Sequence, residues 1–399
     1  MVSYRLRRAS TLAHCSFVQY ILSVNPAILD FPSAKALPTS SPVQEDSLLH
    51  WLALQRIEMV GPIRAQALLE AFGSPQRIFQ ATGEALSQVQ PRLSEGIIRA
   101  ILDGPNLHWA KEQASQAQSL GASILHLDHP EYPQCLRSIS SPPPILFVQG
   151  TIPLTHPRSV AIVGTRKPCQ LGLEAARTFS RAWIGAGVRI VSGLALGIDE
   201  SSHQTALDAG GETVAVLGCP LDGLGTQGRG RLAQDISLQG LLVTEHAFDA
   251  PVKPGNFVRR NRLISGLSQA VVVVQAPRGS GSLITARFAL EQDRELFAAP
   301  GPAGNESWQG NFDLLRQGAQ LCADAEDLLA GMGWSDPHAQ NAPESDSPVV
   351  RLLRRGEATA EEIALQLKLP MNRLQGELVL LELSGAVARV GGGRFAIHR

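Results

Sequence analysis

The chain has 399 residues, enough for two or three domains, of which 44% are hydrophobic and 18% charged. Its 35 lysines and arginines balance 36 aspartates and glutamates, which excludes a protein that grips nucleic acid through overall positive charge but not local basic surfaces. Aromatic residues make up only 5%, which disfavours a binding mode built mainly on base stacking. No apolar run approaches the length of a bilayer span, so we expect no membrane contact.

The first 45 residues differ in composition from the rest. They begin with Arg5, Arg7 and Arg8 and an apolar stretch, but polar residues interrupt that stretch and no clear cleavage signature follows. Residues 24–45 are rich in Pro and Ser, as in a tether. We interpret residues 1–45 as a disordered extension or a misassigned start, and expect a cytoplasmic protein.

From residue 46 the apolar residues recur at helical spacing. The helical stretches lie around 48–57, 65–72, 85–89, 96–102 and 108–120. They predict a small all-helical domain over residues 46–122.

Continuous apolar runs alternate with helical stretches in the next segment. The runs cover residues 159–164, 189–193, 213–218, 241–245, 270–276 and 295–300. Strands that are apolar throughout are typical of a parallel sheet covered by helices on both faces. The pattern predicts an α/β fold, with a Rossmann-like domain over residues 123–330.

A polar linker over residues 331–347 separates this domain from the C-terminal segment. Residues 348–355, 359–368 and 370–384 have helical patterns, and two strands at 387–390 and 394–397 flank a Gly turn. Three helices and a hairpin in this order predict a winged helix over residues 348–399.

Ligands of doubly wound sheets bind at the carboxyl ends of the strands, where the first candidate residues lie. Gly164, Thr165 and Arg166 follow the first apolar run, so that Gly164 allows a close backbone approach and Arg166 supplies a phosphate donor. The alternative for Arg166 is a solvated surface charge. After the second run come Gly193 and then Asp199 and His203, which we interpret as a pair on one helix face rather than a metal or acid–base site.

The most distinctive stretch contains Lys253 and then Arg259, Arg260, Asn261 and Arg262. We expect these arginines at the start of a helix. Because the helix dipole is positive there, clustered guanidinium groups indicate a docking anion rather than helix stabilisation. A solvated run of charges is the alternative.

A Gly/Ser loop follows the apolar run 270–276 and precedes another helix. Strand, loop and helix in this order form a phosphate cradle, with Gly281 and Ser282 as candidates. The Gly-Lys-Ser/Thr of a P-loop and the G-x-G-x-x-G fingerprint are both missing, so no nucleotide cofactor is indicated. Ser192, Ser265 and Ser282 lack an activating partner that the sequence identifies, and five scattered cysteines indicate no metal site. We therefore predict a protein that is not an enzyme and has no cofactor.

The ordered motifs resemble the DNA-processing protein A family, also called Smf. They read VGTR, SGLALGIDESSHQTAL, AVLGC, RNRLISGLS and SGSLITA, and the similarity covers roughly residues 46–330 together with the winged helix. The resemblance implies a sterile-alpha-motif-like helical domain and an extended Rossmann-like domain that binds DNA.

The resemblance also implies a function. It implies a single-stranded-DNA-binding recombination mediator that protects incoming DNA and loads the RecA recombinase during natural transformation, and a homodimer. The DNA-binding residues that it implies are Arg166, Gly193, Lys253, Arg260, Asn261, Arg262, Gly281 and Ser282. The residue patterns above add Gly164, Thr165 and Arg259 to the predicted DNA-binding set. Electrostatic phosphate contacts predict binding that weakens in salt.

Three positions depart from the family pattern. The loop 218–229 lacks the usual Tyr-Pro, Val258 replaces the Pro of Phe-Pro, and Phe312 replaces a usual Asn. One alternative function is a nucleoside-monophosphate phosphoribohydrolase, although the Glu of its P-G-G-x-G-T-x-x-E motif is missing after Arg278. Another is a transcription factor, although the helix 370–384 carries only Arg373 against Glu377 and Glu382.

Overall fold

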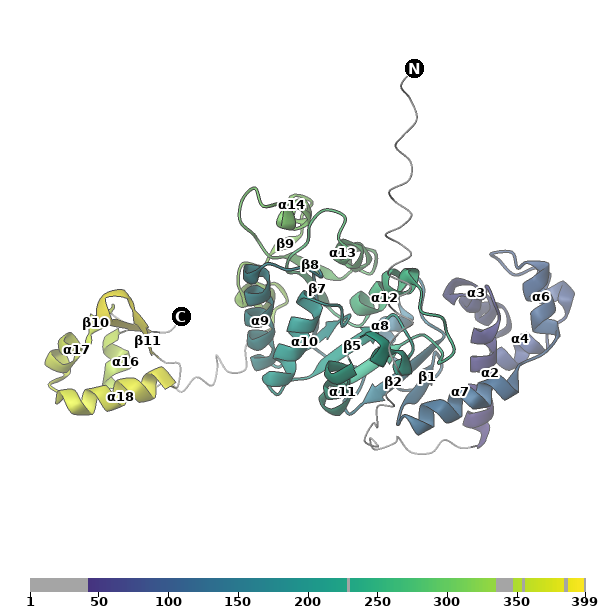
Figure 1. Cartoon of the computed structure of the whole chain (residues 1–399), viewed down its shortest axis with the longest axis horizontal. Coiled ribbons are helices and arrows are strands. Elements are labelled where there is room, and N and C mark those ends of the chain that lie inside the picture. The colour runs from purple at the N-terminus through teal and green to yellow at the C-terminus, as the bar shows by residue number, and fades with distance from the viewer. Residues whose placement is uncertain (1–41, 228–229, 335–346, 354–355, 384–386, 398–399) are drawn as a thin grey trace, which may run out of the picture. The chain divides into compact units, whose positions relative to one another are not determined.

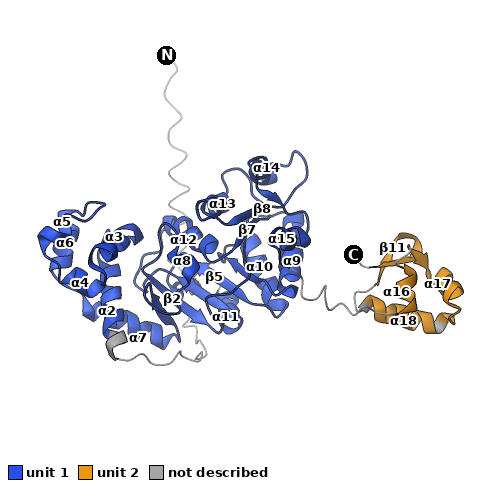
Figure 2. Ribbon diagram, turned by 180° about the vertical axis from the view of Figure 1, so that it is seen from behind, with its two compact units in different colours: residues 1–334 blue, residues 335–399 orange. Residues whose placement is uncertain are grey.

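The computed structural model describes residues 42–227, 230–334, 347–353, 356–383 and 387–397. The chain divides into two compact units, residues 1–334 and 335–399 (Figure 2). Residues 1–41, which hold most of the predicted N-terminal extension, and residues 335–346, which hold most of the predicted linker, lie outside the described residues. Within the described part of the chain, no helix combines the length and the apolar character that a membrane crossing requires.

The first described segment is helical, as predicted. Its helices are α2 Pro42–Arg56, α3 Pro62–Phe72, α4 Pro75–Phe79, α5 Gly83–Ser87, α6 Glu95–Leu102 and α7 Leu107–Ser119. Side chains that accept a backbone N–H bond cap α4, α5, α6 and α7. Leu54, Leu68, Ile78, Leu86 and Ile101 belong to one buried core of this segment.

The helical segment also shares a core with the sheet. Trp51 of α2 and Trp109 of α7 belong to the same buried cluster as Phe147 and Leu242 of the sheet. The Trp109 ring donates from Nε1 to Asp249 Oδ2 over 2.9 Å. The segment is therefore packed onto the sheet rather than tethered beside it.

A nine-stranded sheet occupies the centre of the first unit (Figure 1). Its strands are β1 Ser123–His126, β2 Ile145–Gly150, β3 Ser159–Val163, β4 Arg189–Ser192, β5 Thr213–Leu217, β6 Leu241–Thr244, β7 Ala270–Val273, β8 Glu295–Ala298 and β9 Gln320–Leu321. They are ordered β1-β2-β6-β5-β4-β3-β7-β8-β9. From β6 to β9 every pairing is parallel, which confirms the predicted α/β class.

The edges of the sheet differ from the prediction. β2 pairs antiparallel with both β1 and β6, so the sheet is mixed rather than wholly parallel. β1, β2 and β9 were not predicted from the sequence. β1 and β9 are only four and two residues long, and their burial is partial, so they produce no continuous apolar run. β2 does contain a buried apolar run, ILFV at 145–148, so its signal was present in the sequence but was not recognised.

Helices cover both faces of the sheet, and its central strands are therefore buried throughout. In β3, Ala161 and Val163 join the core under α12 and α13, whereas Val160 and Ile162 join the core under α9 and α10. The helices of this part are α8 Gln134–Arg137, α9 Gln170–Gly185, α10 Ile198–Asp208, α11 Gly230–Gln239, α12 Pro254–Gly266, α13 Ser282–Glu291, α14 Gln309–Arg316 and α15 Ala325–Gly331.

The second unit is the predicted winged helix. It contains α16 Pro348–Leu353, α17 Ala360–Leu367 and α18 Met371–Leu383, followed by the hairpin of β11 Val387–Val390 and β12 Arg394–Ile397. The two-residue strand β10 Ala358–Thr359 pairs with β12 and completes a three-stranded sheet. Thr359 caps α17 in a capping box with Glu362.

The strand order places a topological switch point beside β3. The chain runs from β3 outward through β4 and β5 to β6, and then crosses to β7 on the other side of β3. The loops that follow β3 and β7 therefore diverge at their carboxyl ends and leave a crevice, which is where doubly wound sheets bind their ligands.

Candidate nucleic-acid interface

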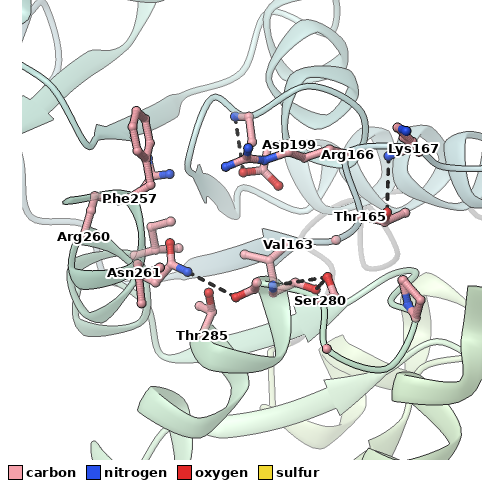
Figure 3. A pocket seen from close by; sticks show the side chains of 18 of the residues that line it. Val163, Thr165, Arg166, Lys167, Asp199, Phe257, Arg260, Asn261, Ser280 and Thr285 are labelled. Atoms are coloured by element: carbon pink, nitrogen blue, oxygen red, sulfur yellow. Dashed lines mark hydrogen bonds between the residues drawn. The ribbon is translucent and has the colours of Figure 1, made fainter. Parts of the chain in front are cut away.

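A cavity of about 540 Å³ lies at this crevice (Figure 3). The loops after β3 and β7, the turn before α10 and one face of α12 contribute its lining. Of the eleven residues predicted from the sequence, seven line it: Gly164, Thr165, Arg166, Arg260, Asn261, Gly281 and Ser282. Four segments distant in sequence thus meet at one edge of the sheet, as the strand pattern predicted.

The loop after β3 presents two cations. Arg166 and Lys167 are exposed, and neither side chain forms a hydrogen bond or an ion pair with the described residues. The loop itself is fixed, because Thr165 N donates to Gln275 O over 2.7 Å and Lys167 N donates to Thr165 Oγ1 over 3.2 Å. Two free positive side chains on an anchored loop suit a phosphate ligand.

Gly164 is required by packing. A Cβ at this position would lie 2.5 Å from Cγ1 of Ile198, the first residue of α10. The glycine therefore lets the N-terminus of α10 approach the end of β3.

The loop after β7 leads directly into the N-terminus of α13. Ser280 Oγ lies 2.7 Å from Ser282 Oγ, and a Cβ at Gly281 would meet nothing within 4 Å, so this side of the cavity is open to a ligand. Arg278 is exposed but paired, since its Nε lies 2.6 Å from Asp313 Oδ2. The hydrogen bond to Asp313 raises the pKa of Arg278. Arg278 therefore stays charged, and its charge is already paired with a carboxylate in the free protein.

The helix α12 does not begin where the sequence analysis placed it. It starts at Pro254, with Lys253 as its N-cap, so Arg259 is already in the second turn. The argument from the helix dipole is therefore wrong for Arg259–Arg262, because the favourable end of the dipole for an anion lies one turn earlier. What α12 does contribute is Asn261, whose Nδ2 donates to Gly281 O over 3.2 Å and ties α12 to the Gly/Ser loop.

Arg260 lies at the floor of the cavity rather than in solvent. It is 3% exposed, and its Nη1 donates to Gly193 O over 2.6 Å and also to Val216 O. A Cβ on Gly193 would lie 2.6 Å from Arg260 Nη2. Gly193 is thus needed because it admits this guanidinium group, and it does not itself line the cavity.

The predicted pairing of Asp199 with His203 is wrong. Asp199 Oδ2 accepts hydrogen bonds from Gly193 N and Ala195 N, whereas His203 Nδ1 lies 2.7 Å from Thr213 Oγ1. Burial raises the pKa of Asp199, and the nearby Arg260 opposes that rise. Asp199 and His203 are thus hydrogen-bonded to different elements, Asp199 to the turn before α10 and His203 to β5.

Arg262 makes a buried ion pair with Glu245. Its Nη2 lies 2.6 Å from Glu245 Oε2 and its Nη1 lies 3.1 Å from Oε1, and the two side chains are 5% and 9% exposed. Arg262 does not line the cavity. A DNA contact for Arg262 stays a prediction, and its geometry favours a structural role. Lys253 and Arg259 are exposed and lie outside the cavity lining, so their DNA contacts stay predictions.

Several residues of the site were not predicted from the sequence. Lys167 and Phe257 line the cavity, and Phe257 is its one aromatic lining residue. A Cβ on Gly218 would lie 2.7 Å from Phe257 Cδ1, so this ring packs over the end of β5. Lys167 could have been predicted as a site residue, because it directly follows Arg166 in the sequence.

Asn311 supports the site from behind. It is fully buried, accepts from Ala276 N over 2.7 Å and donates to the carbonyl oxygens of Val273 and Ala299. It therefore joins the ends of β7 and β8. Phe312 stands where the family pattern has an Asn, but the preceding residue, Asn311, supplies a side-chain amide.

The buried His203 makes stability depend on pH. Burial, reinforced by Arg260, lowers its pKa to about 3 from 6.5. Because the folded pKa is depressed, the unfolded state binds the proton first, so the contribution of His203 is complete above pH 6.5 and is lost as pH falls toward 3. Between pH 7 and 5 we expect it to cost about 2 kcal/mol of unfolding free energy.

Urea unfolding followed by tryptophan fluorescence measures this prediction, because all five tryptophans lie within residues 1–334. His203→Asn should reduce the loss of stability between pH 7 and 5 by that amount. An unchanged pH dependence in the variant would contradict it.

The fold and the cavity define an α/β protein of the doubly wound class, with a crevice lined by basic residues at its switch point and a winged helix as its second unit. Residues 123–333 match the family described as DNA recombination-mediator protein A, and residues 334–393 match the DprA winged helix domain. Protein Smf from Escherichia coli strain K12 is 36% identical over 341 residues, covering 81% of this chain and 87% of that protein.

Two solved structures are similar as well. DNA processing protein A from Streptococcus pneumoniae has a TM-score of 0.63 at 28% identity, covering 71% of this chain and 97% of that one. DNA processing protein A from Helicobacter pylori, described with a single-stranded DNA binding mode, has a TM-score of 0.48 at 31% identity, covering 53% of this chain and 95% of that one. The family match and the Escherichia coli relative show that this chain belongs to the DNA recombination-mediator protein A family, also known as DprA or Smf.

Proposed function

We propose that this protein binds single-stranded DNA at the crevice beside β3 and acts as a recombination mediator without catalysing a reaction itself. The observation that carries the proposal is the pair Arg166 and Lys167, two exposed and unpaired cations at the mouth of a cavity at the switch point. Membership of a recombination-mediator family supports the same conclusion.

The shape of the site favours a single strand over a duplex. A cavity of about 540 Å³ has room for part of an unpaired strand, whose bases are free to turn toward the lining. Arg166 and Lys167 would contact phosphates, and Phe257 offers a ring to a base. Lys253 and Arg259, exposed on the same helix or at its N-cap, would extend the path of the strand.

The further steps of the proposed function concern partners. We propose that the bound strand is delivered to the RecA recombinase during natural transformation, that the protein acts in the cytoplasm and that it forms a homodimer. All of these proposals follow from family membership together with the sequence motifs.

The alternative function, hydrolysis of a nucleoside monophosphate, is less well supported. Asp199 is the carboxylate among the residues that line the cavity, and two backbone N–H groups already occupy its Oδ2. Ser282 also lines the cavity, and its hydroxyl group shares a hydrogen bond with that of Ser280. The one carboxylate of the described lining thus already holds backbone N–H groups, which argues against its use as a general acid or base.

Fluorescence anisotropy with a labelled single-stranded oligonucleotide, with duplex as competitor, tests the proposal. We expect binding that duplex competes for poorly, and an affinity whose logarithm falls with log salt by about 0.7 for each contacted phosphate. Equal competition by duplex would contradict the proposal. Release of a free base from AMP under the same conditions would support the alternative instead.

A further inference from the structure

Asp199 is a carboxylate at the floor of a cavity whose proposed ligand is an anion. It is 6% exposed and lines the cavity together with Arg166, Lys167 and Arg260. In a site that only collects positive charge, an acidic residue would weaken binding. The hydrogen bonds of Asp199 indicate another role, because they hold backbone N–H groups of the turn before α10.

Asp199 and Arg260 bind the two backbone polar groups of Gly193, and we call this arrangement the clamp. Gly193 N donates to Asp199 Oδ2 over 3.1 Å, while Gly193 O accepts from Arg260 Nη1 over 2.6 Å. Ala195 N adds a second, longer bond of 3.4 Å to Asp199 Oδ2. Both backbone groups of Gly193 are thus fixed, one by α10 and one by α12.

The clamped segment in turn contacts the loop that carries Arg166. Gly197 has φ of +88°, and a Cβ there would lie 2.6 Å from Thr165 O and 3.0 Å from the Arg166 carbonyl carbon. Ile198 N donates to Thr165 O over 3.4 Å. The turn between β4 and α10 therefore packs directly against the backbone of Thr165 and Arg166.

We propose that Asp199 is a positioning residue for DNA binding, which fixes the turn 193–197 and through it the phosphate-binding loop 164–167. The proposal rests on the proposed function of the cavity. In this arrangement Arg260 is the partner of Asp199 in the clamp, and Arg166 is the group that touches the ligand.

Substitution of Asp199 separates positioning from simple charge, because the two predict opposite signs. Asp199→Ala removes both a negative charge and the acceptor for Gly193 N. If charge alone mattered, single-stranded DNA would bind more tightly; if Asp199 positions the loop, we expect binding at least fivefold weaker. Asp199→Asn removes the charge but keeps an acceptor oxygen, and we expect its affinity to stay within twofold of wild type.

Asp199→Glu completes the set. It keeps the charge but moves the acceptor by one methylene, so the positioning account predicts weaker binding and the charge account predicts no change. This variant also decides the question if Asp199→Ala does not fold. Binding by Asp199→Ala or Asp199→Glu as tight as or tighter than wild type would overturn the proposal.

Hydrogen exchange measured by mass spectrometry on the DNA-free protein tests the clamp independently. Peptides that cover residues 164–167 and 193–199 should exchange faster in Asp199→Ala and Asp199→Glu than in wild type, and at wild-type rates in Asp199→Asn. Unchanged exchange in all three variants would overturn the clamp. If wild type fails to bind single strands, the proposed function fails, while the exchange result still decides whether Asp199 fixes the loop.

Discussion

Changing both Arg166 and Lys167 to glutamate should weaken single-stranded DNA binding about a hundredfold, equivalent to about 2.7 kcal/mol. The two side chains are exposed and make no ion pair with described residues, so the substitutions cost little in folding. They replace the two proposed phosphate contacts by two repulsive charges. We also expect the slope of log affinity against log salt to become shallower by about 1.4, which is two single-strand contacts.

A matched control separates the local contact from net charge. Arg177 and Arg181 lie on α9, are exposed and do not line the cavity. Changing both to glutamate alters the net charge by the same amount, and we expect an affinity within about threefold of wild type. Equal losses in the two double variants, measured by anisotropy, would show that general electrostatics rather than this site governs binding.

Breaking the buried pair of Arg262 and Glu245 should produce the largest loss of stability. Arg262→Met leaves the Glu245 carboxylate, which is 9% exposed, without its bidentate partner. Removal of one partner of such a pair costs about 3–5 kcal/mol, because a charge is left buried and uncompensated. Urea unfolding at pH 7 measures the change in unfolding free energy.

The double variant Arg262→Met with Glu245→Leu provides the control. Replacing both charges by apolar side chains should recover most of the lost stability. If Arg262 acts only within the fold, this variant should bind single-stranded DNA within twofold of wild type. A stable double variant that binds DNA tenfold more weakly would instead place Arg262 among the DNA contacts, as the sequence motif implied.

The central strands and the winged helix could be predicted because their sequences repeat one simple pattern. Strands such as β5 and β7 are buried on both faces, so every residue is apolar or small and the run stands out. β1 and β9 are short and partly exposed, and they form through pairing with neighbours that are distant in the chain. Local sequence carries little information on such pairings.

The location of the site followed from topology, but the roles of its side chains did not. Strand ends of a parallel sheet share one edge, so Arg166 and Gly281 could be placed together from the order of elements alone. The partner of a charged side chain depends on contacts between elements far apart in sequence. In the sequence Arg262 and Arg166 therefore looked alike. In the structure Arg262 is buried in an ion pair with Glu245, whereas Arg166 is exposed.

Photo-crosslinking of a single-stranded oligonucleotide that carries 4-thiothymidine, followed by mass spectrometry, would show where the bound strand lies on the protein. We expect crosslinked peptides around residues 164–167, 254–261 and 277–282, which are lost in the variant with Arg166 and Lys167 changed to glutamate. Crosslinks confined to the winged helix or to the helices α2 to α7, and unaffected by that variant, would contradict it.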